Sequence, residues 1–224
     1  DLIEEIARLL GYDRFASNLP YPIKPGLLSE SQICERNLRL KLVSTGIQEI
    51  TTYSLVGKNN EDEAQIGITN PLLAETSHLR TNLWEEHLLI CKRNIDAGMS
   101  SCWIFEIGNI YEKRNEIYAE KKLLSGVLTG IKSIEKWSNT SKEKDLDFYR
   151  ARGVLEETLM GMKLKTDDIP LIDNYFMHPG KSSKIVVEGK PIGIFGELHP
   201  SLTSSLDLKG KFYIFQLDCN ELIK

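Results

Sequence analysis

The sequence lacks the features of a membrane or secreted protein. No apolar run among its 224 residues approaches the roughly 18 residues of a membrane-spanning helix. The first residues, Asp1 to Glu5, do not follow the basic, apolar and small-residue order of a signal peptide. We therefore expect a cytoplasmic protein with no membrane partner. The sequence begins in a helical pattern without an initiator Met, so we interpret it as a piece of a longer chain.

Cysteine is scarce as well. The four cysteines lie far apart and form no Cys-x-x-Cys pair: Cys34, Cys91, Cys102 and Cys219. That spacing provides neither a zinc site nor a redox dithiol. A disulfide framework is typical of smaller, loop-rich secreted chains, so we expect the cysteines to be reduced.

Positive charge is not in excess. The chain has 28 Lys and Arg against 32 Asp and Glu, a net charge of −4. A surface that grips a phosphate backbone is usually basic, so a nucleic-acid-binding module is disfavoured. The apolar fraction of 41% and the charged fraction of 27% are ordinary for a globular protein, and the length suits one main domain with a short appendage.

The common catalytic motifs are missing. There is no Gly-x-Ser-x-Gly elbow, no phosphate-binding loop and no dinucleotide fingerprint, which disfavours a Ser-His-Asp hydrolase and a nucleotide-binding α/β protein. The four histidines do not group, and residues 84–87 lack the second His of a helical zinc site. His178 and His199 each precede a proline, so we predict that they make hydrogen bonds in turns.

The apolar pattern does predict helices. Residues at helical spacing indicate helices over 2–10, 29–45, 83–95 and 148–162. Gly11 is typical of the residue after a helix, and Asn82 with Glu85 three residues later is typical of a helix start.

Strands are predicted by β-branched and aromatic runs over 47–56, 103–111, 123–128, 184–187, 192–195 and 212–217. Glu188-Gly189 indicates a hairpin, and residues 193–200 indicate a buried strand that runs into a helix. Several connections are too short for the helical crossovers of a parallel sheet. We therefore predict an α+β fold with a mostly antiparallel sheet flanked by helices. Residues 132–147 are rich in Lys and Glu without a period, which predicts a mobile loop.

Three prolines within residues 18–26 predict an extended linker. A set of short segments on both sides of it resembles the β subunits of bacterial phenylalanyl-tRNA synthetases. In chain order, these segments are Asp1-Leu2-Ile3-Glu4-Glu5-Ile6-Ala7-Arg8, Gly11-Tyr12-Asp13, Thr52-Tyr53-Ser54, Asn70-Pro71-Leu72, Leu79-Arg80-Thr81, Phe105-Glu106-Ile107-Gly108, His178-Pro179-Gly180, Gly196-Glu197-Leu198-His199-Pro200 and Leu206-Asp207-Leu208-Lys209-Gly210. The resemblance implies that residues 1–20 are the tail of a preceding small domain, 21–28 a linker and 29–224 a core like that of class II synthetases.

The resemblance also implies that this core is not catalytic. Class II enzymes hold the ATP α-phosphate with an arginine two residues before a strand acid, and here Ile104 precedes Glu106 in that way. A second arginine follows their glycine-rich strand, whereas Glu197 follows Gly196 and no arginine occurs from residue 193 to 224. Fixed cations stabilise the charge that develops in adenylate formation. We therefore expect no catalytic or cofactor-binding residues here, with ATP bound by the catalytic α subunit. Glu106 is interpreted as a hydrogen-bonded sheet residue.

Asp1, Glu4 and Glu5 are spaced so that their carboxylates can meet on one side of a first helical turn. The simplest interpretation is that these acids favour the positive end of a helix. The resemblance implies instead that they bind a Mg²⁺ shared with the α subunit, together with an aspartate six residues upstream of Asp1. Mg²⁺ prefers hard oxygen ligands of this kind.

The function implied by the resemblance is that of a scaffold. The core would dock the α subunit in an α2β2 assembly that uses ATP to charge tRNA(Phe) with phenylalanine, and tRNA would bind through the whole complex. The predicted helix 29–45 could use Ile33, Leu38, Leu42 and Val43 in the core or against a partner, and the sequence leaves both open. The alternative is a stand-alone adenylate-forming enzyme that holds phosphate with Arg80 or Lys181.

Overall fold

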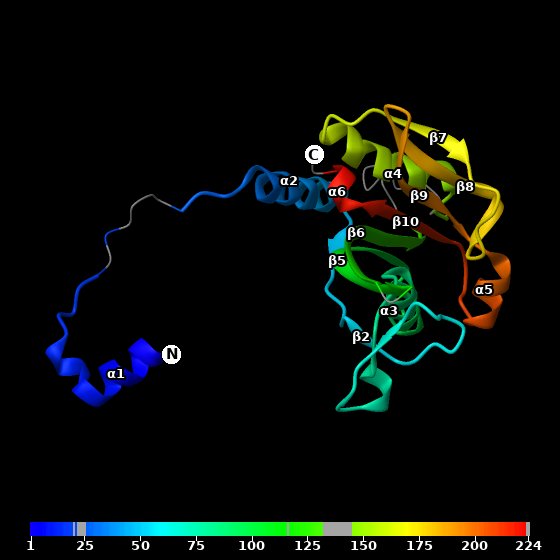
Figure 1. Cartoon of the computed structure of the whole chain (residues 1–224). Coiled ribbons are helices and arrows are strands. Elements are labelled where there is room, and N and C mark those ends of the chain that lie inside the picture. Colours follow the sequence, from blue (N-terminus) through cyan, green and yellow to red (C-terminus); the bar gives the residue numbers. More distant parts are fainter. Residues whose placement is uncertain (20, 22–25, 116, 132–144, 223–224) are drawn as a thin grey trace. The chain divides into compact units, whose positions relative to one another are not determined.

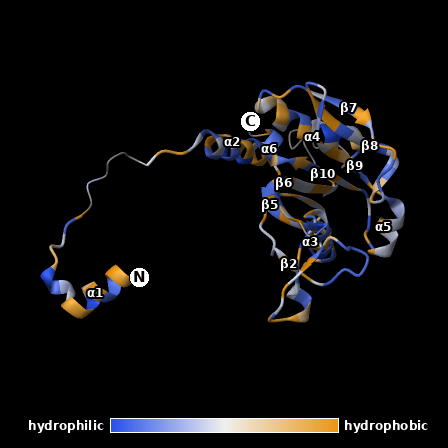
Figure 2. Cartoon of the chain, in the orientation of Figure 1, coloured by the Kyte–Doolittle hydropathy of each residue, from blue (hydrophilic) through white to orange (hydrophobic). Residues whose placement is uncertain are grey.

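The computed structural model describes residues 1–19, 21, 26–115, 117–131 and 145–222 and divides into two compact units, Asp1–Glu30 and Ser31–Lys224. In the first unit, helix α1 (Leu2–Leu10) ends at Gly11 as predicted, and this glycine adopts φ 86. No residue of α1 is buried, and its apolar residues colour parts of the ribbon orange in Figure 2. Most of the predicted loop at 132–147, and residues 22–25 of the linker, lie outside the described residues.

The second unit is built on a seven-stranded sheet with the order β1-β5-β6-β10-β9-β8-β7 (Figure 1). The strands are β1 (Gln48–Glu49), β5 (Ser101–Arg114), β6 (Ile117–Gly130), β7 (Thr166–Pro170), β8 (Met177–Val187), β9 (Lys190–Leu198) and β10 (Phe212–Asp218). Neighbouring strands are antiparallel except for the short parallel pair of β1 and β5. The predicted α+β class is therefore confirmed, and the sheet is mixed.

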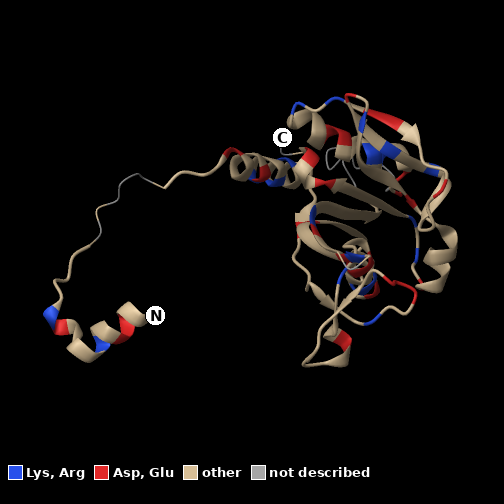
Figure 3. Ribbon diagram, viewed as in Figure 1, with Lys and Arg blue, Asp and Glu red and all other residues tan. Residues whose placement is uncertain are grey.

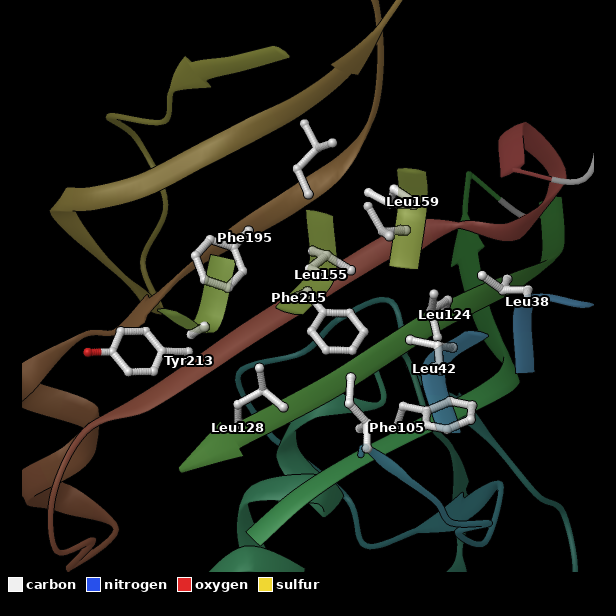
Figure 4. Packing of buried hydrophobic residues seen from close by; sticks show 14 of the residues in the cluster. Leu38, Leu42, Phe105, Leu124, Leu128, Leu155, Leu159, Phe195, Tyr213 and Phe215 are labelled. Carbon is white, nitrogen blue, oxygen red and sulfur yellow. The ribbon is translucent and has the colours of Figure 1, made fainter. Parts of the chain in front are cut away.

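Helices cover both faces of this sheet. One face is packed by α2 (Glu30–Ser44), α4 (Phe148–Gly161) and α6 (Cys219–Leu222), and the other by α3 (Trp84–Asp96) and α5 (Pro200–Ser205). Figure 4 shows Leu155 and Leu159 of α4 beside Phe215 of the sheet, all three fully buried. Side chains alternate along a strand, so β5 sends Phe105 into this cluster and Ile104 into the one under α3.

Two predicted turns are confirmed. Glu188 and Gly189 join β8 to β9 with φ 50 and φ 80, and positive φ at both residues matches a tight hairpin with strand twist. β9 runs directly into α5, where His199 caps the helix and Pro200 occupies its first turn.

The single strand predicted over 47–56 is wrong. Gln48–Glu49 pairs with β5, whereas β2 (Leu55–Val56) belongs to a separate sheet with β4 (His78–Leu79) and β3 (Ile66–Gly67), in the order β2-β4-β3. Between them, the backbone N–H and the hydroxyl of Thr52 donate to the carboxylate of Glu106. A buried acid has thus overridden the β propensity of this run. The edge strand β7 was not predicted, because acids and a terminal proline are unusual in strands.

Candidate functional site

Three of the resemblance segments meet at a buried acid between the main sheet and α3. Glu106 projects from β5 and is almost fully buried, as is Arg80, which follows β4. Arg80 Nη1 lies 3.0 Å from Glu106 Oε1. Glu106 Oε2 accepts from the Thr52 hydroxyl at 2.6 Å and from His87 Nε2, on α3, at 3.2 Å. The prediction that Glu106 is a hydrogen-bonded sheet residue is confirmed.

These partners keep Glu106 ionised. Burial opposes the charge, but hydrogen bonds from His87 and Thr52, together with the charge and hydrogen bond of Arg80, lower the pKa of Glu106 to about 2. Because the carboxylate accepts a hydrogen bond from Nε2, His87 carries a proton on that nitrogen. Its buried Nδ1 has no hydrogen-bond partner in the part of the chain that the structure describes. The result is a buried ion pair whose two charges balance each other.

Gly108, two residues beyond Glu106 on β5, leaves room for this pair. A Cβ at Gly108 would lie 2.5 Å from Arg80 Nη2 and 2.8 Å from Glu106 Oε1. Both distances are shorter than real Cβ contacts, so the segment Phe105–Gly108 needs its glycine for packing. The roles of Thr52, Gly108 and His87 were not predicted. The first two lie within resemblance segments, whereas nothing in the sequence marks His87.

Arg80 also makes hydrogen bonds to the loop and strand around it through Nε and Nη1. Its Nε donates to the backbone oxygen of Asn109 at 2.9 Å, and its Nη1 donates to the Thr52 hydroxyl at 2.7 Å. Only 5% of the side chain is exposed. A guanidinium that binds a triphosphate must present its donors to the ligand, and Arg80 uses these donors to hold the sheet and loop together.

The two positions that were compared with the arginines of class II enzymes do not share a site. Ile104 lies in the apolar cluster under α3. Glu197 on β9 stands opposite Tyr213 on β10, whose ring packs in the cluster of the other face. Directly opposite residues of an antiparallel pair point to the same face, so Ile104 and Glu197 lie on opposite faces of the sheet. Lys181 Nζ lies 3.0 Å from Glu197 Oε2, so this acid is paired too.

The predicted turn hydrogen bonds of His178 and His199 are confirmed. His178 Nδ1 accepts the backbone N–H of Gly180 at 3.0 Å. His199 Nδ1 accepts the backbone N–H of Ser201 at 3.2 Å at the start of α5. Both are turn hydrogen bonds, and neither ring is bonded to an acid of the described ranges in the way a catalytic triad requires.

Asp1, Glu4 and Glu5 are all exposed in the first turn of α1. Glu5 Oε2 is bound by Arg8 Nη2 at 2.6 Å. Within the described ranges, no group of three or more His, Cys, Asp or Glu residues could hold a metal ion. Carboxylates suit Mg²⁺ chemically, but these three are not gathered around one point, so the magnesium site stays a prediction.

Helix α2 divides into a buried and an exposed apolar face. Leu38 and Leu42 have no exposed surface and pack in the core. Ile33, Leu40 and Val43 are exposed by 47%, 62% and 53%. The structure thereby assigns two of the four apolar residues left open by the sequence to the core, and it adds Leu40 to the exposed set.

The described part of the chain contains no helix with the length and apolarity needed to cross a membrane.

Comparison with known proteins agrees with the resemblance. Residues 17–219 match the family model described as the phenylalanyl tRNA synthetase beta chain CLM domain. Two relatives named phenylalanine–tRNA ligase beta subunit, from Prochlorococcus marinus strains MIT 9313 and NATL2A, are 49% and 50% identical over 224 residues. A third with that name, from Synechococcus sp. strain CC9902, is 50% identical over 223 residues. Each match covers all of this chain but only 27% or 28% of the relative. The chain belongs to the family of the phenylalanyl-tRNA synthetase beta chain CLM domain.

Proposed function

We propose that this chain is the non-catalytic scaffold core of a phenylalanine–tRNA ligase β subunit. It folds like a class II synthetase and docks the catalytic α subunit in an α2β2 assembly. The assembly charges tRNA(Phe) with phenylalanine in the cytoplasm, and tRNA binds through the whole complex. The names of the relatives support the β-subunit assignment, although the chain spans just over a quarter of their length.

The observation that carries the non-catalytic role is the closed pairing of the charges. Arg80 is held by Glu106, Thr52 and Asn109, and Lys181 is held by Glu197. The rival, a stand-alone adenylate-forming enzyme, needs one of these two cations to hold phosphate. ATP would then be bound by the α subunit. Mg²⁺ would be shared with that subunit at Asp1, Glu4 and Glu5, with Glu5 released from Arg8.

The exposed face of α2 supports the docking role. Ile33, Leu40 and Val43 lie 7 and 3 residues apart, so they follow one side of the helix in the described residues. A stable subunit interface is large and has an apolar centre, and the exposed apolar row on α2 would contribute to such a centre.

Light scattering of this chain mixed with full-length α subunit tests the docking. We expect a complex heavier than either component, and we expect Leu40→Asp to weaken it. Tyr149→Asp is the matched control, because Tyr149 is an 84% exposed apolar residue on a different helix, α4. Two components that never associate, or equal effects of both variants, would contradict this docking face.

ATP–pyrophosphate exchange tests the non-catalytic role separately. We expect no exchange by the chain alone. Exchange that Lys181→Ala abolishes would favour the stand-alone enzyme, because an ion-paired surface lysine has no other reason to matter for turnover.

A further inference from the structure

A large cavity opens on the α3 face of the main sheet. Its volume is about 810 Å³, which is within the range of small-molecule binding sites. Ile194 of β9 and Gln216 of β10 form part of its wall, with Leu202 and Leu206 of α5 beside them. The proposed scaffold role does not use this space, since the docking helix α2 packs on the other face of the sheet.

Aromatic rings form another wall. Trp84 stacks on Phe176 with ring centroids 4.7 Å apart and planes 9° from parallel. Tyr175 stands edge-on to both rings, at 6.5 Å from Trp84 and 5.2 Å from Phe176. Tyr175 is 74% exposed, so a ring held in fixed geometry faces open space. Faces of Trp and Tyr attract cations and also accept flat apolar groups.

The charged groups of the cavity are acidic. Glu61 and Asp62 come from the loop after β2, whose acidic stretch is visible in Figure 3, and Glu85 comes from the first turn of α3. None of the three forms an ion pair with a basic residue in the described ranges. Arg114 also lines the cavity, but its Nη2 lies 2.9 Å from Glu112. The enclosed space therefore keeps uncompensated negative charge.

The local bonds of these acids leave acceptors free for a ligand. Asp62 accepts the Thr81 hydroxyl at 2.5 Å, and Glu85 accepts only the side-chain amide of Asn82 at 2.9 Å among the described residues. Glu85 is exposed at the mouth of the cavity, yet enclosure by the walls raises its pKa, and the charges of Asp62 and Glu86 raise it further. A cation nearby would relieve both effects.

Gln216 adds an independent observation. The residue lines the same cavity, and its Oε1 is buried and has no hydrogen-bond partner among the described residues. Buried carbonyl oxygens are nearly always bonded, so an orphaned one calls for a donor that the chain does not supply. Acceptors, acids and ring faces therefore surround one space.

We propose that this cavity binds a small organic ammonium ion that carries an aromatic or apolar ring. The ring packs against Trp84, Tyr175 and Phe176, and the ammonium donates to the carboxylates at the mouth and to Gln216 Oε1, which turns from its buried position toward the ligand. Anions are repelled by the acids, and a neutral ligand leaves them uncompensated. The site gives the scaffold a ligand-binding function of its own.

Calorimetric titration of this chain with three matched probes tests the site. The probes are benzylamine, which is cationic at neutral pH, benzyl alcohol, which is neutral, and benzoate, which is anionic. We expect benzylamine to bind about tenfold more tightly than benzyl alcohol, as one charge-assisted hydrogen bond implies, and benzoate not to bind. Equal binding of the three probes, or binding of none, overturns the proposal.

Three variants assign the binding to this cavity. Glu85→Gln should weaken benzylamine binding about tenfold, because it removes one charge at the mouth. Asp96→Asn at the far end of the same helix is the control and should leave binding unchanged, because Asp96 is exposed and does not line this cavity. Equal losses from the two variants would show a general effect of charge and would refute the site.

Gln216→Met separates binding from folding. The variant removes a buried oxygen without a partner, so the melting temperature should stay equal or rise while benzylamine affinity falls at least threefold. Unchanged affinity with unchanged stability would refute the role of Gln216 and with it the proposed pose. Light scattering with the α subunit measures complex formation, whereas calorimetry measures benzylamine binding by this chain alone, so the scaffold role and this site can fail independently.

Discussion

The two faces of the main sheet differ in packing, in buried charge and in open space. Under α2, α4 and α6 the packing is closed, with Leu155, Phe195 and Phe215 fully buried, and the Glu197–Lys181 pair of this face reaches solvent through Lys181. Under α3 and α5 the apolar cluster is interrupted by the Glu106–Arg80 pair and borders the acidic cavity. A closed apolar face gives stability, whereas charges and open space on the other face come at a cost in stability. The difference indicates that one face holds the fold together and the other retains room for a ligand.

The largest expected effect is the loss of the buried acid. Glu106→Gln should lower the free energy of unfolding by about 4 kcal/mol, because Arg80 is left buried without its counter-charge. Glu197→Gln on the opposite face should cost at most about 1 kcal/mol, because its partner Lys181 is 41% exposed. Urea unfolding measures both. Equal losses in the free energy of unfolding would mean that removing a carboxylate has the same effect on both faces, against our expectation.

Leucine truncation compares packing on the two faces. Leu155→Ala should cost about 3 kcal/mol, because it opens a void in close-packed core. Leu202→Ala should cost about 1 kcal/mol, because the methyl groups removed already border the cavity. The free energies of unfolding in urea give the comparison, and a cost at Leu202 as large as that at Leu155 would argue against an open cavity.

The pH dependence of stability should come largely from the α3 face. Glu106 has a pKa of about 2 in the folded state, lowered from 4.5, so its ionisation stabilises the fold above pH 4.5. That contribution, about 3 kcal/mol, should be lost as the pH falls from 4.5 toward 2. Urea unfolding at several pH values should show it as a difference between wild type and Glu106→Gln. Parallel curves would contradict the assignment.

The smallest expected effects on stability come from substituting two glycines by alanine, and they should have opposite signs. Gly108→Ala should destabilise by about 2 kcal/mol, because the new Cβ meets Arg80 Nη2 at 2.5 Å. Gly153 lies in α4 with nothing within 4 Å of an added Cβ, so Gly153→Ala should stabilise by up to about 1 kcal/mol. Thermal melts should therefore move in opposite directions. A neutral Gly108→Ala would show that the ion pair shifts freely.

Sequence patterns predicted elements best where the local signal was strong. The helix over 148–162 and the Glu188-Gly189 hairpin were found because periodicity and turn chemistry agree with the final packing. The strand over 47–56 failed because Thr52 bonds to Glu106, which is 54 residues away in the chain. The site was predicted in part: Glu106 was placed correctly, but its partner His87 and the cavity residue Gln216 carry no local signal.

Residue identity and short-range periodicity are enough to establish the family, the α+β class and the absence of arginine from residue 193 onward. They do not show that Ile104 and Glu197 lie on opposite faces, that Arg80 is paired, or that Leu40 rather than Leu38 faces outward, and these facts come from the folded structure. One cause explains all three. Pairing of charges and burial of side chains depend on which strands and helices become neighbours, and those neighbours are distant in the chain.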